Sequence, residues 1–105
     1  MKRIALAAAL LLPAATLAAW AAQTVSQKDK QFATDTLTVK AGESVTFTND
    51  DQVTHDITVT GPDGSTAPGV MEKPGDHATL TFAKPGEYKV WCLIHPKMKM
   101  TITAQ

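Results

Sequence analysis

The segment WCLIHPKMKM, residues 91–100, carries most of the chemistry of this 105-residue chain. It contains the single cysteine, Cys92, together with His95, Met98 and Met100. A thiol, an imidazole and a thioether are thus brought together in the order C-x-x-H-x-x-M. Thiolate and thioether sulfurs favour Cu(I), and imidazole accepts either oxidation state, so this donor set indicates a copper site.

A trigonal blue-copper site needs a second imidazole beside the thiolate. His55 is the candidate, because it opens the alternating segment HDITVTG and shares a face with Ile57 and Val59. We therefore expect His55, Cys92 and His95 to be the strong metal ligands. His77 follows a turn and has no metal-binding partner at a suitable spacing, so we expect it to be exposed and not a ligand.

The weak axial ligand is less well specified by the residues themselves. Met98 and Met100 have the same strand parity, so the alternation of inward and outward side chains does not separate them. Trp91 has the opposite parity to Cys92 and is expected on the other face of the strand.

Short alternations of apolar and polar residues recur along the chain and are separated by turns rich in glycine and proline. This pattern predicts an all-β sandwich or barrel with antiparallel strands in a single domain. The segment QTVSQKDKQ is expected to be a frayed lead-in or an edge strand. The expected strands lie within residues 36–50, 55–61, 77–83, 88–92 and 99–104.

Residues 1–21 have the layout of a cleaved secretory signal peptide. A short basic start, MKR, is followed by an apolar run and by the small residues Ala19 and Ala21. The run is interrupted by Pro13, whereas a membrane-spanning helix needs about 20 apolar residues. We expect export to the periplasm and a domain over residues 22–105, with cleavage after Ala22 or retention as an N-terminal anchor as alternatives.

The charge balance after the signal segment bears on possible partners. Eight lysines stand against ten acidic residues in 22–105, a net charge of −2. Nucleic-acid-binding domains usually carry a basic excess, so this class is not expected. A lone cysteine in an oxidising compartment is an intermolecular disulfide partner, a buried inert thiol or a chemically occupied group such as a metal ligand.

Two stretches make the chain resemble the cupredoxins, small type 1 copper proteins of the plastocyanin and amicyanin group. They are LTVKAGESVTFTNDD, followed by His55, and KPGEYKVWCLIHPKM near the C-terminus. The resemblance implies a Greek-key β-sandwich with one type 1 copper site held by His55, Cys92, His95 and Met98. Met98 has the spacing from His95 seen in amicyanin, and Met100 has the spacing seen in plastocyanin and pseudoazurin.

The same resemblance implies an electron carrier that is not an enzyme. It would be a monomer that makes transient contacts with a c-type cytochrome, a dehydrogenase or a reductase, and it would not associate with the membrane after signal cleavage. One alternative is a periplasmic copper-binding or copper-trafficking protein that uses the same ligands. A second is an interaction module whose cysteine is incidental.

The chain departs from the family pattern at two places. Asp56 follows the first histidine where cupredoxins often carry asparagine, and a carboxylate accepts hydrogen bonds but cannot donate them. Its charge is also expected to favour Cu(II). Leu93 and Ile94 replace more polar or proline residues and make the surroundings of the sulfur more apolar.

Overall fold

The computed structural model describes residues 23–105, so the predicted signal peptide lies outside the described residues. All the regular secondary structure within this range consists of β-strands. The strands are β1 (Gln23–Lys28), β2 (Gln31–Phe32), β3 (Thr36–Val39), β4 (Glu43–Asn49), β5 (His55–Thr60), β6 (Val70–Glu72), β7 (His77–Phe82), β8 (Gly86–Cys92) and β9 (His95–Ala104). None of the described residues forms a helix long and apolar enough to cross a membrane.

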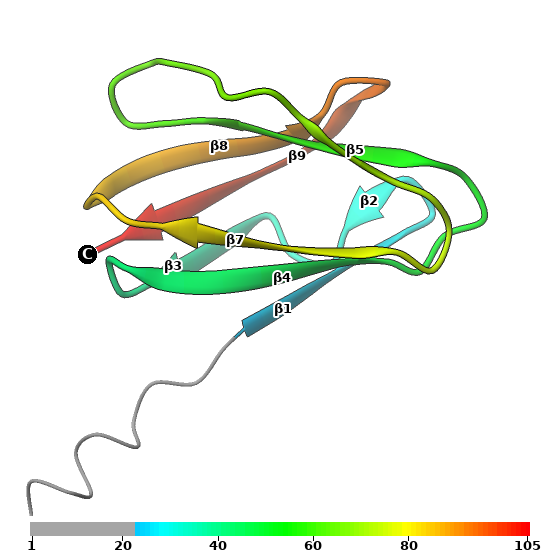
Figure 1. Ribbon diagram of the computed structural model, residues 1–105, viewed down its shortest axis with the longest axis horizontal. Coiled ribbons are helices and arrows are strands. Elements are labelled where there is room, and N and C mark those ends of the chain that lie inside the picture. The colour runs from blue at the N-terminus through cyan, green and yellow to red at the C-terminus, as the bar shows by residue number, and fades with distance from the viewer. Residues whose placement is uncertain (1–22) are drawn as a thin grey trace, which may run out of the picture.

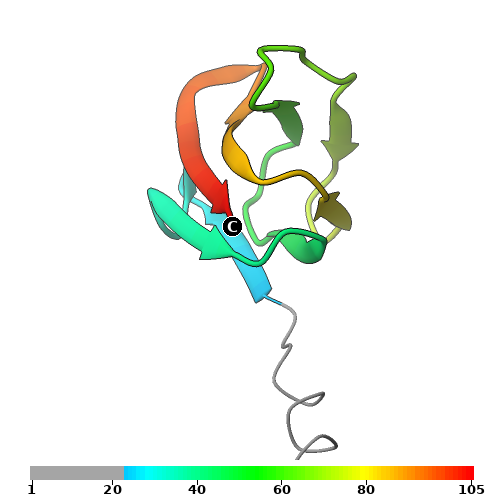
Figure 2. The ribbon, with the colours of Figure 1, turned by 90° about the vertical axis from the view of Figure 1, so that its left-hand side faces the viewer.

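The strands form two packed sheets, which confirms the predicted β-sandwich (Figure 1). One sheet has the order β2-β1-β4-β7, and the other has the order β3-β9-β8-β5-β6. Figure 2 shows the two layers from the end of the sandwich that carries the C-terminus. The C-x-x-H-x-x-M motif lies in the five-stranded sheet, at the junction of β8 and β9.

The sequence predicted antiparallel strands, but two of the strand pairs are parallel. β1 pairs with β4 in parallel, and β3 pairs with β9 in parallel. Both pairs join strands that are not consecutive in the chain, and such pairings cannot be read from local alternation. The two-residue strand β2 pairs with the last two residues of β1, Gln27 and Lys28, on the outer side of that strand.

The core between the sheets follows the period-two pattern of the sequence. In β8, Tyr88, Val90 and Cys92 are buried while Trp91 faces outward, as expected. In β7, His77 is exposed, also as expected. The buried apolar residues are Val25, Phe32, Val39, Val45, Phe47, Ile57, Phe82, Tyr88, Val90, Cys92, Met98, Met100, Ile102 and Ala104.

The link between β8 and β9 determines where the metal-binding side chains lie. Cys92 pairs directly with His95, so only Leu93 and Ile94 form the tip of the hairpin. The register shifts between Trp91 and Cys92, because Trp91 pairs with Lys99. Residues 96–98 therefore form an extra loop of backbone opposite a single step of β8, which is a β-bulge.

Candidate metal centre

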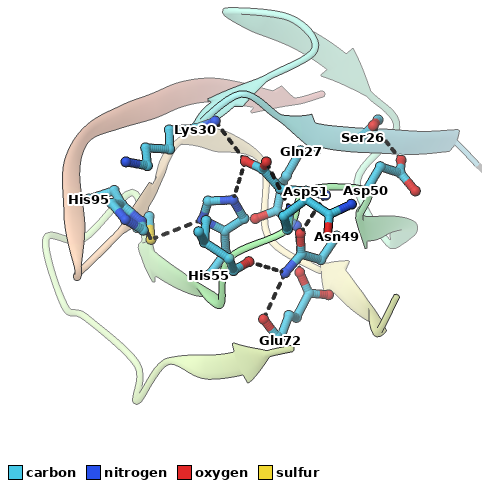
Figure 3. A network of polar contacts seen from close by, with 12 residues as sticks. Ser26, Gln27, Lys30, Asn49, Asp50, Asp51, His55, Glu72 and His95 are labelled. Carbon is cyan, nitrogen blue, oxygen red and sulfur yellow. Dashed lines mark hydrogen bonds and ion pairs between the residues drawn. The ribbon is translucent and has the colours of Figure 1, made fainter. Parts of the chain in front are cut away.

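His55 is the first residue of β5 and is fully buried. Its Nδ1 lies 3.9 Å from the Cys92 sulfur, and its Nε2 lies 3.0 Å from an Asp51 carboxylate oxygen. A carboxylate can only accept a hydrogen bond, so Nε2 carries the ring proton and Nδ1 presents its lone pair. The Asp51 contact thus selects the tautomer in which Nδ1 faces the sulfur (Figure 3).

Asp51 is itself held by the turn between β1 and β2. The backbone N–H of Lys30 donates to Asp51 Oδ2 at 2.8 Å, and Asp29 and Lys30 both have positive φ angles, 54° and 57°. Two consecutive positive φ values are typical of a two-residue hairpin turn whose twist matches its strands. Chiefly the Lys30 hydrogen bond, and then the one from His55, lower the pKa of Asp51 to about 2. Asp51 is therefore ionised at neutral pH and keeps its contact with His55.

Cys92 ends β8 and its side chain is inaccessible to solvent. Its sulfur accepts a hydrogen bond from the backbone N–H of Asp56 at 3.3 Å. It makes no disulfide with any described residue. A sulfur that is buried, unpaired and faced by two imidazole nitrogens is placed as a metal ligand would be.

His95 opens β9 and is the one strong donor that reaches the surface. Its Nδ1 lies 3.6 Å from the Cys92 sulfur, and its ring meets the His55 ring edge-on with centroids 5.1 Å apart. The side chain is half-buried, and its neighbours Leu93, Ile94 and Pro96 are exposed.

The separations between the donor atoms fit a metal ion. One ligand atom each from His55, Cys92 and His95 lies within 4.8 Å of the others. A metal bonded to sulfur at about 2.3 Å and to nitrogen at about 2.0 Å holds these atoms roughly 3.5–3.7 Å apart at angles of about 110–120°. The sulfur–nitrogen separation to His95, 3.6 Å, falls within this range, and the separation to His55, 3.9 Å, is slightly longer. Two imidazoles and one thiolate are the equatorial donors of one type 1 copper ion.

The strand register bears on the axial methionine. Met98 lies in the bulge between the pairs Trp91–Lys99 and Cys92–His95, whereas Met100 pairs with Val90. Val90 is two residues before Cys92, and two residues of an antiparallel strand span roughly 7 Å. Both methionines are buried, but the register brings Met98 nearer to the level of the sulfur.

The Asp56 side chain accepts hydrogen bonds, as expected of a carboxylate. One oxygen, Oδ1, accepts from the backbone N–H of Leu93 at 3.2 Å and from the hydroxyl of Thr58. The first of these bonds ties β5 to the β8–β9 hairpin. Gly69 packs against the same carboxylate, because a Cβ there would lie 2.2 Å from Asp56 Oδ2.

A buried polar network beside His55 was not predicted from the sequence. Glu72 pairs with His55 in the β5–β6 ladder, and its carboxylate accepts from the Gln27 side-chain amide. The Asn49 amide donates to the backbone oxygens of Glu72 and Val53, both at 2.9 Å. Burial raises the pKa of Glu72 above its ordinary value, although the Gln27 hydrogen bond opposes this. Gln27 shares a face with buried Val25, and that parity was the only signal in the sequence.

The chain is similar to known copper proteins in sequence and fold. Residues 2–104 match the family model of the cupredoxin-like domain. The chain is similar to the reduced state of an amicyanin variant, with 27% identity, a TM-score of 0.73 and coverage of 80% of this chain and 82% of that chain. The reduced Cu(I) form at pH 4 of another amicyanin variant has 27% identity, a TM-score of 0.73 and coverage of 87% and 89%.

A purple cupredoxin from Nitrosopumilus maritimus has the same fold, at 24% identity and a TM-score of 0.66, with coverage of 79% of this chain and 99% of that chain. Among curated proteins, none matches the sequence significantly. The match to the domain model spans nearly the whole chain, and the donor geometry agrees with it. The chain belongs to the cupredoxin-like family.

Proposed function

We propose that this protein is a periplasmic blue-copper electron carrier whose metal is held by His55, Cys92, His95 and Met98. One observation carries the proposal: a buried thiol and two imidazole nitrogens converge with separations that suit a single ion. When bound, copper supplies a one-electron couple between Cu(I) and Cu(II).

The protein residues around the donors hold them in place in both oxidation states. Asp51 orients His55, and the Asp56 N–H orients the sulfur of Cys92. The Asp56 carboxylate ties the hairpin that carries His95 to β5. Donors held in this way move little when the charge of the ion changes, and a small rearrangement allows fast electron exchange.

Met98 completes the donor set as the weak axial ligand in this proposal. Its place in the β-bulge, near the level of Cys92, supports it over Met100. Replacing Met98 by Leu should shift the reduction potential while leaving copper bound. Replacing Met100 by Leu should change stability more than potential, and the reverse result would assign the axial role to Met100.

The exposed edge of His95 is the proposed contact for a redox partner such as a c-type cytochrome, a dehydrogenase or a reductase. Leu93 and Ile94 beside it are 59% and 48% exposed, which is unusual for such large apolar side chains. Small apolar contacts suit brief encounters, because electron-transfer interfaces typically bury less than about 1,200 Å² in total. The proposed periplasmic location rests on the signal-like residues 1–21.

The test is to add Cu(II) to the purified protein and record its visible spectrum. We expect an intense thiolate-to-copper charge-transfer band that Cys92→Ser abolishes. Protein loaded with zinc serves as a colourless control. Protein that keeps an intact thiol but develops no such band would refute the proposal. Voltammetry separates a carrier from a copper-trafficking protein, since a carrier must show rapid and reversible one-electron cycling.

A further inference from the structure

Strand β7 forms one edge of the four-stranded sheet, next to β4 (Figure 1). No other described strand pairs with its opposite side. At the start of the ladder the backbone N–H of Asn49 donates to the backbone oxygen of Asp76 at 2.9 Å. Because successive residues of an antiparallel strand direct their backbone groups to alternate sides, the groups that point away from β4 are those of His77, Thr79 and Thr81.

This edge lacks the features that usually keep a strand from pairing with another chain. The sequence of β7, HATLTF, contains no lysine, acidic residue or proline, and its pairing with β4 has no bulge. The other edge strands, β2, β3 and β6, have two, four and three residues, whereas β7 has six. Proteins normally shorten, charge or bulge an edge, because its unpaired backbone groups are a template for a further strand. β7 is the longest edge of the described sheets and is unprotected.

The inward face of β7 borders an apolar hollow. Leu80 points toward the core but is only partly buried, whereas its partner on β4, Val45, is completely buried. The hollow has a volume of about 210 Å³ and is lined mainly by apolar side chains, including Val59, Val70, Leu80 and Phe82. An apolar side chain supplied from beside β7 would cover this opening and remove apolar surface from water, which is favourable.

We propose that β7 pairs with β7 of a second copy of the chain, in antiparallel orientation about a two-fold axis at Leu80. In this register Leu80 lies opposite the partner's Leu80, and Thr79 lies opposite the partner's Thr81. The threonine pairs are the hydrogen-bonded ones, which their outward backbone groups allow. The leucine pair is a non-hydrogen-bonded pair, in which opposed side chains lie closest. Both leucines then meet at the edges of the two apolar hollows.

The charges at the two ends of β7 support a second copy as the partner. Asp76 directly precedes the strand and Lys84 follows it by two residues, and both side chains are exposed. With Leu80 on the axis, Asp76 of each copy lies opposite the partner's Lys84, so two ion pairs of opposite charge flank an uncharged strand. A shift of the register by two residues would keep the backbone pairing and lose both ion pairs. Such self-complementarity is what a two-fold interface requires.

The dimer would leave both metal centres accessible. β7 begins near the metal centre, because Asn49 binds both Asp76 and the backbone oxygen of Glu72, which is the ladder partner of His55. Antiparallel pairing therefore puts the two centres at opposite ends of the dimer, each with its His95 edge free. The dimer departs from the monomer that the family resemblance implies, and it does not depend on the carrier function.

The test measures the mass of the purified full chain by sedimentation equilibrium over a range of concentrations, with copper and without. We expect a monomer–dimer equilibrium. Thr79→Lys combined with Thr81→Lys places like charges opposite each other and should raise the dissociation constant by about tenfold or more. The control, Thr36→Lys with Thr38→Lys, adds the same charge at exposed positions of the edge strand β3 and should change it by no more than about twofold.

Two results would overturn the proposal at this stage. One is a wild-type chain that stays monomeric at about 1 mM, the weak end of measurable association. The other is an equal loss of association in the β7 variant and the β3 control, because the loss would then follow net charge and not the strand that carries it.

Mixing two variants separates a lost contact from a damaged fold. Thr79→Glu with Thr81→Glu should also be monomeric by itself, but an equal mixture with the lysine variant should form a heterodimer, since each added lysine then faces an added glutamate. A mixture that stays monomeric would refute the pairing of β7 with β7.

The register is tested by reversing the charges at the strand ends. Asp76→Lys should weaken the dimer about tenfold, because two ion pairs become like-charge contacts. Adding Lys84→Asp to that variant should restore the wild-type affinity to within about threefold. A double variant as weak as Asp76→Lys alone would refute the register centred on Leu80.

Discussion

His55 and His95 present the same ring atom to one sulfur, yet their surroundings are opposite. His55 is fully buried, and Asp51, Asn49 and Glu72 form a polar network around and behind it (Figure 3). His95 lies on a two-residue hairpin tip with exposed apolar side chains beside it. The β5 side of the centre is thus built from buried hydrogen bonds, and the β8–β9 side is built from exposed apolar surface.

The difference shows how one site can meet two requirements. The β5 side holds the His55 ring in one tautomer and one position. A metal site whose donors must move little when the ion changes charge needs this. The β8–β9 side brings a donor to the surface, which contact with a partner needs. Changes on the β5 side should therefore alter metal binding and stability, and changes at the hairpin tip should alter exchange with partners.

The largest expected effect is that of Asp51→Ala on the β5 side. Removing the hydrogen-bond acceptor of His55 Nε2 should lower copper affinity by about 10- to 100-fold, because such outer contacts orient the ligand ring. Competition with a chelator measures the change. Asp50→Ala is the control, since Asp50 bonds Ser26 and Thr48 and makes no contact with His55. Equal affinities for the two variants would show that Asp51 does not position the ligand.

Gly69→Ala should disrupt the hydrogen bond from the Leu93 backbone N–H to the Asp56 carboxylate, which joins the β5 side to the β8–β9 side. The new Cβ would lie 2.2 Å from Asp56 Oδ2 and 2.7 Å from the Thr58 hydroxyl, so the carboxylate that binds Leu93 must move. Crowding of this kind typically costs about 1–3 kcal/mol, measured by urea unfolding. Gly61→Ala is a control in the same loop, because its nearest contact would be an ordinary 3.5 Å. A Gly69 variant as stable as the Gly61 variant would mean that the close packing is not restrictive.

Glu72→Gln should raise the stability of the metal-free protein at neutral pH. The raised pKa means that folded protein binds more protons than unfolded protein above the ordinary value of 4.5, so wild-type stability falls as pH rises through this range. Glutamine keeps an oxygen to accept the Gln27 hydrogen bond and cannot ionise. Thermal unfolding at several pH values should show a gain that disappears in acid. A gain independent of pH would mean that ionisation of Glu72 is not its cause.

The smallest effect on the centre is expected from Leu93→Ser combined with Ile94→Ser at the hairpin tip. Both side chains are exposed, so stability should change by no more than about 0.5 kcal/mol for each and the copper band should stay in place. The rate of electron self-exchange between two copies should fall, because the apolar contact beside His95 is lost. NMR line broadening in mixed-valence samples measures that rate. A shifted absorption band with an unchanged rate would reverse the distinction between the two sides.

Much of the fold was predictable because buried strands leave a period of two in the sequence. The inward positions of β8, the outward Trp91 and the exposed His77 followed from parity. The short strands β2 and β6 did not, since two or three residues are too few to show a period. The parallel pairs also escaped prediction, because pairing between distant strands has no local signature.

The supporting residues of the site escaped prediction for a related reason. Gln27 and Glu72 are polar residues in strands, where a polar side chain is normally expected to face solvent, and Asp51 lies in a polar loop between β4 and β5. Whether such a side chain is buried depends on what another part of the chain places over it. Here the β1–β2 turn reaches Asp51, and β1 supplies the partner of Glu72.

The sequence by itself determined the donor chemistry, the family and the alternation that turns Cys92 inward. These are properties of residue identity and short-range spacing, which need no knowledge of distant contacts. Only the tertiary structure decided that His55 meets Cys92, that Asp51 selects its tautomer and that Met98 lies nearer than Met100 to the level of the sulfur. Those outcomes depend on strand register and on a bulge between β8 and β9, and both arise from packing the whole sandwich together.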